Sequence, residues 1–284
     1  MRSSNPKSIH EILKSNAITI KKRYGQNFLI DDNILQNIVA LGRITNETLV
    51  IEIGPGLGSL TQYLVNKAKH VIAYEIDNDL IPILKSTFTS EHFTLIHDDI
   101  LKRNIDNDIA TIKQSFDQIV VIANLPYYIT TPILMKCLEE SKRINRMVVM
   151  MQLEVARRLT ANKNTKDYNA LSVAVQYRAY TNFAFKVPKN VFIPAPNVES
   201  AVITLDFGAQ KDHNVKNETF FFECVKAAFK QRRKTLLNNL SLFLEMDKDT
   251  LSKCLNEINI PPQIRAEALT LEEFVIIANY FNKL

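Results

Sequence analysis

The sequence predicts an α/β protein, in which a doubly wound and mainly parallel sheet is followed by a small all-helical domain. Two observations carry this prediction. Between about residue 49 and residue 207, short runs rich in Val and Ile alternate with segments of helical periodicity, which is the pattern of βαβ units. After the polar stretch 208–217, only helical periodicity follows.

The predicted strands have little alternation of polar and apolar residues, as expected for parallel strands buried on both faces. These strands are 49–53, 70–74, 93–97, 118–123, 146–151, 171–180 and 200–207.

The predicted helices fall into two groups. In the sheet domain they are 60–67, 80–88, 132–141 and 154–161, and in the helical domain they are 221–229, 235–244, 251–258 and 271–281. We therefore predict a basic N-terminal arm over 1–23, a sheet domain over 24–207 and a helical domain over 208–284.

The composition is typical of a soluble globular protein, with 46% hydrophobic and 23% charged residues. No apolar run approaches the roughly 20 residues that span a bilayer, and no secretory signal is apparent. Cys137, Cys224 and Cys254 are too far apart in the sequence for a CxxC motif. This spacing argues against a disulfide framework or a zinc site, and we expect a cytoplasmic location.

The net charge of +5 is concentrated at the N-terminus, because residues 1–24 contain six basic side chains and one acid. A basic arm on a neutral body favours contact with nucleic acid. A solvated tail is an equal alternative. A mitochondrial targeting peptide is less favoured, because Lys outnumbers Arg in the arm.

The first chemical motif is a glycine turn after the first predicted strand, where Gly54, Gly56 and Gly58 hold half of the six glycines of the chain. Such a turn lets the backbone pass close to a ligand, although a purely structural turn is the alternative. The GxGxG spacing, with Pro55 inside it and Glu52 before it, is unlike the GxGxxG of dinucleotide sites. A positively charged cofactor without phosphates, S-adenosylmethionine, fits this turn better.

Acidic residues follow the next two predicted strands. Glu75 is placed to accept the ribose hydroxyls of a cofactor, while Asp77 is an alternative that could cap the next helix. Asp99 could accept a hydrogen bond from the adenine amine of the cofactor.

At the end of the fourth predicted strand stand Asn124, Leu125, Pro126 and Tyr127. The N6 amine of adenine is a poor nucleophile. The side-chain carbonyl of Asn124 and the backbone carbonyl of Leu125 could each accept one N6 hydrogen and orient the lone pair. Pro126 holds Leu125 in an extended conformation, and Tyr127 could stack on the base. A strand-end turn capped by Asn is the structural alternative.

Four motifs together resemble the ribosomal RNA adenine dimethylase family, and within it the bacterial enzymes that act on small-subunit rRNA. The motifs are YGQNFL at 24–29, EIGPGLG at 52–58, NLPYYITTP at 124–132 and FIPAPNVESAV at 192–202. The resemblance implies a Rossmann-like class I methyltransferase domain with a seven-stranded sheet. It also implies dimethylation of two adjacent adenosines in a 3′-terminal hairpin of 16S rRNA.

The same resemblance implies a set of site residues. The cofactor-binding positions would be Asn27, Leu29, Gly54, Glu75, Asp99 and Asn124, and the aromatic clamp on the target adenine would be Tyr127 and Phe192. Two positions depart from the family pattern: Leu153 stands where a basic residue is usual, and Asn169 stands where glycine is usual. These departures bear on RNA contacts rather than on the reaction.

Three basic groups are candidates for rRNA phosphate contacts, with a solvated surface as the alternative. They are Lys21–Arg23 in the arm, Arg157 with Arg158, and the cluster Lys230, Arg232, Arg233 and Lys234.

Four other functions remain open for this sequence. One is methylation of 23S rRNA, as in macrolide resistance, which the stretch 193–202 and the longer helical C-terminus disfavour. Others are a mitochondrial relative active in transcription, an assembly factor that mainly binds ribosomes, and a DNA adenine methylase. No dimer interface is apparent, and we expect a monomer bound to the small ribosomal subunit or its precursor.

Overall fold

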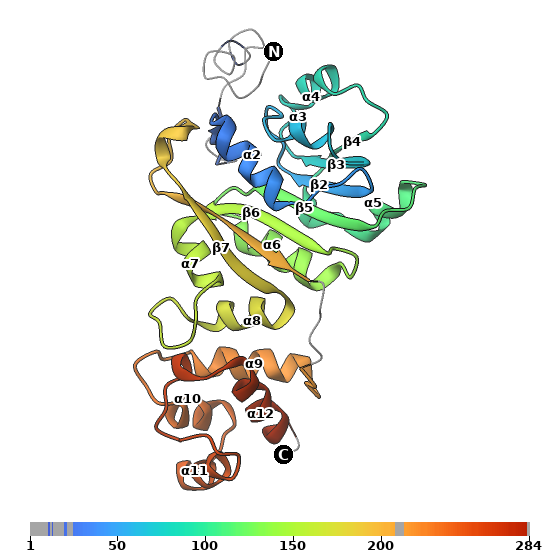
Figure 1. The fold of residues 1–284 in the computed structure, drawn as a ribbon. Coiled ribbons are helices and arrows are strands. Elements are labelled where there is room, and N and C mark those ends of the chain that lie inside the picture. Colours follow the sequence, from blue (N-terminus) through green and yellow to red (C-terminus); the bar gives the residue numbers. More distant parts are fainter. Residues whose placement is uncertain (1–10, 12, 14–19, 22–24, 208–212, 283–284) are drawn as a thin grey trace. The chain divides into compact units, whose positions relative to one another are not determined.

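The computed structural model describes residues 11, 13, 20–21, 25–207 and 213–282 (Figure 1). The chain divides into two compact units. Unit 1 comprises residues 1–156 and 182–208, and unit 2 comprises residues 157–181 and 209–284. The helical unit therefore includes residues 157–181 in addition to residues 209–284, and residue 208 of the predicted segment 208–284 belongs to unit 1.

A seven-stranded sheet forms the centre of unit 1, in the order β4-β3-β2-β5-β6-β9-β7 (Figure 1). The five strands from β4 to β6 pair in parallel, whereas β9 is antiparallel to β6. The chain runs outward from β2 through β3 to β4 and then returns to place β5 on the other side of β2. This reversal creates a crevice at the carboxyl ends of β2 and β5, where ligands bind in open α/β sheets.

Six of the seven predicted runs form strands in the structure. The strands that the structure describes are β1 (Phe28–Leu29), β2 (Thr48–Ile53), β3 (His70–Glu75), β4 (Phe93–His97), β5 (Gln118–Asn124), β6 (Arg146–Gln152), β7 (Tyr180–Val187), β8 (Phe192–Ile193) and β9 (Ser200–Asp206). The short strands β1 and β8 pair with each other in a separate two-stranded sheet, which the sequence did not predict.

Both faces of the large sheet are buried along its inner strands β3, β2, β5, β6 and β9, which explains their unbroken apolar runs, whereas the edge strands β4 and β7 are mostly half-buried or exposed. On one face, side chains such as Val50 and Val120 pack against Leu35 of α2 and Leu64 of α3. On the other face, residues of opposite parity such as Ile51 are equally buried. Helix α5 lies on this second side, since the Tyr74 hydroxyl donates to Asp108 at 2.9 Å.

The described α-helices lie at the predicted positions, except that α2, α5 and α8 were not predicted. They are α2 (Asp32–Leu41), α3 (Thr61–Leu64), α4 (Ile81–Thr87), α5 (Ile105–Thr111), α6 (Thr130–Glu140), α7 (Leu153–Leu159), α8 (Ala170–Arg178), α9 (Glu218–Ala228), α10 (Leu236–Phe243), α11 (Lys248–Glu257) and α12 (Leu271–Phe281). Short 3-10 helices occur at η2 (Ile100–Lys102), η3 (Lys189–Val191) and η4 (Ala266–Ala268).

The prediction of a strand at 171–180 was wrong, because most of this segment forms α8. Asn169 caps the helix: its side chain accepts from Leu171 N and Ser172 N, while the Ser172 hydroxyl accepts from Asn169 N. This capping box and the burial of Val173 and Val175 outweigh the strand preference of valine. Asn169 has an extended backbone, with φ −157°, so no glycine is required where the family pattern has one.

Unit 2 has its own core, built from helices α8 to α12 and η4. Phe221 of α9 and Phe274 of α12 are among its fully buried side chains. Helix α12 begins with a second capping box, in which Thr270 and Glu273 exchange hydrogen bonds. Within the described residues, no helix of either unit is long and apolar enough to cross a bilayer.

Candidate functional site

A pocket opens in unit 1 at the crevice between β2 and β5. It is lined by the segment 25–29, the glycine turn after β2, the loops after β3 and β4, and the end of β5. All of the predicted cofactor positions line it: Asn27, Leu29, Gly54, Glu75, Asp99 and Asn124. The topology therefore gathers residues that lie as far as 97 positions apart in the sequence.

Gly54 and Gly56 of the glycine turn line this pocket. Gly54, Gly56 and Gly58 all have positive φ values, of 71°, 59° and 83°, which L side chains rarely adopt. A Cβ on Gly54 would meet no atom within 4 Å, so it would project into open space. By contrast, a Cβ on Gly58 would lie 2.4 Å from the Phe88 ring. Gly54 therefore leaves room for a ligand, and Gly58 is required for packing.

Glu75 ends β3 and is only 6% exposed. Its Oε1 accepts from the backbone N–H groups of Ile76 and Asp77, at 2.9 and 2.8 Å, and its Oε2 accepts from Gly56 N at 3.2 Å. Burial raises the pKa of the carboxyl, although these three hydrogen bonds favour the ionised form. A carboxylate has about four acceptor sites, so Oε2 can accept one more donor, such as a ribose hydroxyl.

Two other carboxyl groups line the pocket close to the glycine turn. Asp99 accepts from Leu101 N at 3.0 Å and thereby begins η2. Glu52 is 1% exposed and accepts from the Thr61 hydroxyl at 2.7 Å. Burial raises the pKa of Glu52 to about 8, and the nearby charge of Glu75 adds to this effect.

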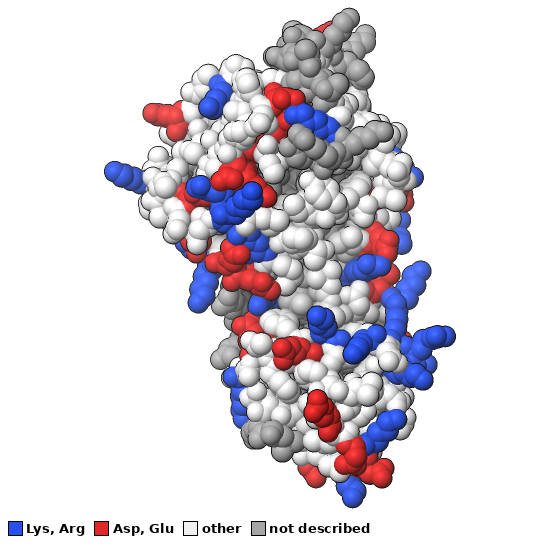
Figure 2. Space-filling view, turned by 180° about the vertical axis from the view of Figure 1, so that it is seen from behind, with Lys and Arg blue, Asp and Glu red and all other residues white. Residues whose placement is uncertain are grey.

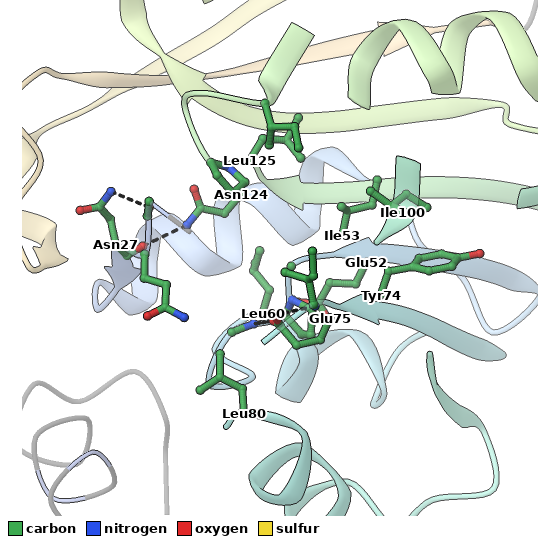
Figure 3. A pocket seen from close by; sticks show the side chains of 18 of the residues that line it. Asn27, Glu52, Ile53, Leu60, Tyr74, Glu75, Leu80, Ile100, Asn124 and Leu125 are labelled. Carbon is green, nitrogen blue, oxygen red and sulfur yellow. Dashed lines mark hydrogen bonds between the residues drawn. The ribbon is translucent and has the colours of Figure 1, made fainter. Parts of the chain in front are cut away.

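The side chain of Asn124 points toward the backbone of Asn27 in the pocket wall (Figure 3). The side-chain Nδ2 of Asn124 donates to the backbone oxygen of Asn27 at 3.3 Å. Because a carbonyl oxygen can only accept, this contact places the amide nitrogen toward Asn27 and turns Oδ1 the other way. Asn27 itself donates from Nδ2 to Gly25 O at 3.0 Å, which fixes the turn that carries it.

The residues after Asn124 lie in the same pocket. Leu125 N donates to Met150 O at 3.1 Å, and the Pro126 carbonyl accepts from Ile129 N and from the Thr130 hydroxyl. Tyr127 is half-buried, and its hydroxyl shares a 2.7 Å hydrogen bond with Ser200 Oγ. Burial raises the pKa of Tyr127, so the phenol stays protonated at neutral pH. The structure thus brings Leu125, Pro126 and Tyr127 beside Asn124.

Phe192 is the one predicted site residue outside the pocket lining. It pairs with Leu29 between β8 and β1, and it is 3% exposed in the core that covers the large sheet. Its position therefore supports the segment 28–29 that forms part of the pocket wall.

The charges of the pocket fit S-adenosylmethionine. Glu52, Glu75, Asp98 and Asp99 line it, and no Lys or Arg does so among the residues that the structure describes. Glu52 is largely protonated at neutral pH and Asp98 contacts Arg103 at 3.6 Å, but Glu75 and Asp99 still give the wall an acidic character that suits a positive sulfonium and disfavours a pyrophosphate. The open space above Gly54 provides room for such a group.

Two features near the pocket were not part of the predicted site. Tyr128 lines the pocket mouth and is 60% exposed, the highest exposure among the large hydrophobic side chains except Leu242. Asp77 does not form the N-cap of α4, which is Leu80; instead it is fully buried and contacts Lys21 and Gln26. Lys22 and Arg23, also predicted to bind RNA, lie outside the described residues. The only sequence signal for Asp77 was an acid in the loop after the second predicted strand, and its burial is seen only in the structure.

The sequence matches proteins of known function along almost its entire length. The family model described as ribosomal RNA adenine dimethylase matches residues 17–283. A protein from Geobacillus sp. named ribosomal RNA small subunit methyltransferase A is 47% identical, over 97% of this chain and 96% of its own length. A protein of the same name from Streptococcus pneumoniae is 46% identical, over 98% of each chain.

Solved structures show the same fold. A dimethyladenosine transferase from Plasmodium falciparum superimposes with a TM-score of 0.75 and 24% identity, over 90% of this chain and 98% of that one. The 23S rRNA methyltransferase ErmE gives a TM-score of 0.69 and 22% identity, over 90% of this chain and 100% of that one. The family model, the sequence relatives and the pocket agree. The chain belongs to the ribosomal RNA adenine dimethylase family.

Proposed function

We propose that this protein transfers methyl groups from S-adenosylmethionine to N6 of two adjacent adenosines in the 3′-terminal hairpin of 16S rRNA. The observation that carries the proposal is the single pocket shared by the glycine turn, Glu75 and the strand end from Asn124 to Tyr127. The small-subunit names of the relatives at 46–47% identity support the choice of 16S over 23S rRNA.

The cofactor would be held by residues of three loops. Glu75 accepts a ribose hydroxyl at Oε2, Asp99 accepts from the adenine amine, and Gly54 leaves space for close approach of the ligand. Asn27 and Leu29 complete the wall. When bound, S-adenosylmethionine supplies an electrophilic methyl group on a positively charged sulfur.

The target adenine would be oriented by the end of β5. Asn124 Oδ1 accepts one N6 hydrogen, because the contact to Asn27 turns Nδ2 away. The Leu125 carbonyl accepts the other, which directs the N6 lone pair toward the methyl group. Tyr127 stacks on the base, and its bond to Ser200 holds the ring in place.

Catalysis in this site would come from orientation and exclusion of water rather than from proton transfer. No general base is needed, since the methylated amine is acidic enough while it carries the positive charge to release its proton to water. The half-buried Tyr127 hydroxyl, whose pKa is raised, is not suited to act as a base at neutral pH.

Unit 2 carries the surface that we assign to rRNA phosphates. Lys230, Arg233 and Lys234 are exposed just before α10, and Arg232 contacts Glu267 at 3.2 Å. Asn164 N donates to Glu267 O at 2.7 Å, which brings the exposed Lys163 and Lys166 close to this cluster. Figure 2 shows Lys and Arg side chains gathered on one side of unit 2. Such clustering favours binding to a polyanion.

The same proposal covers the setting in which the enzyme acts. We propose a monomer that binds the small ribosomal subunit or its precursor in the cytoplasm, where this substrate is assembled.

Primer extension on small subunits tests the proposed reaction. Cells that lack this gene should lose the reverse-transcriptase stop at the two adjacent adenosines near the 3′ end of 16S rRNA, because dimethylated adenines block the enzyme. The wild-type gene should restore the stop, and a gene carrying Asn124→Ala should not. A stop restored in 23S rRNA instead, or in neither rRNA, would overturn the substrate assignment.

A further inference from the structure

Asp77 is a buried carboxylate next to the cofactor pocket but outside its lining. Its residue is 0% exposed, although it lies only two positions after Glu75, in the loop that follows β3. A buried carboxylate is strongly destabilising unless charged or hydrogen-bonding groups satisfy it. The identity of its partners therefore indicates what this residue does.

The partners of Asp77 come chiefly from the segment that precedes β1. Oδ1 contacts the Lys21 ammonium and accepts from Asp79 N at 3.2 Å, while Oδ2 accepts from Gln26 Nε2 at 2.6 Å. Lys21 N also donates to Gln26 Oε1 at 2.8 Å, and its ammonium lies 2.6 Å from Asp79. The Asp77 carboxylate thus binds both Lys21 and Gln26.

These hydrogen bonds also control the charge of the group. Burial alone would raise the pKa of Asp77, but the bonds from Lys21, Asp79 N and Gln26 outweigh it and hold the pKa below its usual value. The carboxylate is therefore ionised at neutral pH, and charge-assisted hydrogen bonds of this kind are about twice as strong as neutral ones.

The segment that Asp77 binds is a wall of the pocket. Gly25, Gln26, Asn27 and Phe28 all line it. The Phe28 ring packs with Leu57 of the glycine turn, and a Cβ on Gly56 would lie 3.3 Å from it. Displacement of this segment would open the pocket on the side of the glycine turn.

The backbone of Asp77 contributes to the same site. Its N–H donates to Glu75 Oε1 at 2.8 Å, so that the loop which presents the ribose acceptor also carries the carboxylate that binds the segment. Asp77 therefore connects two walls of the pocket, its backbone to Glu75 and its side chain to Lys21 and Gln26.

We propose that Asp77 is a positioning residue whose carboxylate, through Lys21 and Gln26, holds the pocket wall 25–28 in place and so sets the affinity for S-adenosylmethionine. The identity of the ligand rests on the proposed function. If a smaller fraction of the protein holds the closed wall, the apparent dissociation constant rises in inverse proportion to that fraction. Saturating cofactor restores the closed form, so the loss appears in the Kd and KM for the cofactor and not in kcat.

Asp77→Asn tests this proposal, because the amide keeps the shape of the carboxylate but loses its charge. Its NH2 group would also face a donor, either the Lys21 ammonium or Gln26 Nε2. We expect the Kd for S-adenosylmethionine, measured by titration calorimetry, to rise about ten- to hundredfold. The KM for the cofactor should rise in parallel, while kcat at saturating cofactor and the KM for rRNA stay within about twofold. Hydrogen exchange over residues 25–29 should become faster in the variant without cofactor.

Asp117→Asn is the matched control, since Asp117 is exposed and lies before β5, away from the pocket lining. If Asp77→Asn does not fold, Gln26→Leu and Lys21→Met remove the partners singly and should each weaken cofactor binding. An Asp77→Asn variant, or both partner variants, with wild-type affinity and wild-type exchange would overturn the role of Asp77. A wild-type protein that fails to bind S-adenosylmethionine would instead overturn the proposed function.

Discussion

The side-chain amide of Asn124 donates to the backbone oxygen of Asn27, 3.3 Å away, although 97 positions separate the two residues. This contact joins the strand end that would orient the target base to the segment that walls the cofactor pocket. It also determines which end of the Asn124 amide faces away from Asn27, and therefore which atom is presented to a substrate.

Replacing Asn124 with Ala should lower kcat for rRNA methylation by about a hundredfold or more, the usual effect of removing one oriented hydrogen-bonding group. The fold should persist, because the side chain is only partly buried and makes one long hydrogen bond. Single-turnover methylation with saturating cofactor measures the change. Asn107→Ala, on the exposed side of α5, is the control. Near-wild-type turnover of Asn124→Ala would contradict the orienting role.

Two substitutions of Tyr127, to Phe and to Ala, separate the contribution of its ring from that of its hydroxyl. Tyr127→Phe loses the bond to Ser200 and about 1 kcal/mol of stability, but it keeps the stacking surface and should keep most activity. Tyr127→Ala also loses the ring, and stacking on a base contributes about 1–3 kcal/mol. We expect the KM for rRNA to rise at least about fivefold in the Ala variant only. Equal activity of the two variants would exclude stacking by Tyr127.

Glu52 should make the stability of unit 1 depend on pH. Its pKa is raised to about 8 in the fold, from 4.5 for an unperturbed glutamate, so the folded state retains a proton that the unfolded state loses. Its contribution is thus fully present below about pH 4.5 and is lost as the pH rises through 8. The free energy of unfolding should fall by up to roughly 1.4 kcal/mol per pH unit within this window.

Urea unfolding between pH 5 and pH 9 measures this dependence. Glu52→Gln keeps the shape and can still accept from Thr61, so it should flatten the profile. Glu91→Gln, at a side chain that is 88% exposed, should leave the profile as it is in the wild type. A Glu52→Gln profile as steep as that of the wild type would show that this carboxyl is not protonated in the fold.

The basic cluster before α10 should govern the salt dependence of rRNA binding. Replacing Lys230, Arg233 and Lys234 with Gln should flatten the slope of log affinity against log salt by about one unit for each phosphate contact that is lost. The cofactor Kd should not change. The control replaces Lys67, Lys85 and Lys113, which are exposed in unit 1. An unchanged slope in the cluster variant would remove these residues from the rRNA interface.

The sequence by itself determined the class of the fold and most of the pocket. Six of the seven predicted strands are present, because a strand buried on both faces leaves a local signal, an apolar β-branched run. Gly54, Glu75, Asp99 and Asn124 were placed together because the carboxyl ends of parallel strands meet at one edge of a sheet.

Only the tertiary structure decided the contacts between segments that are distant in the chain. The capping box of Asn169 and packing of the valines made a helix where the residue preferences favour a strand. The burial of Phe192 follows from the pairing of β8 with β1, and the role of Asp77 follows from the approach of Lys21 and Gln26. Periodicity and propensity are local properties, whereas these pairings depend on which surfaces meet when the chain is compact.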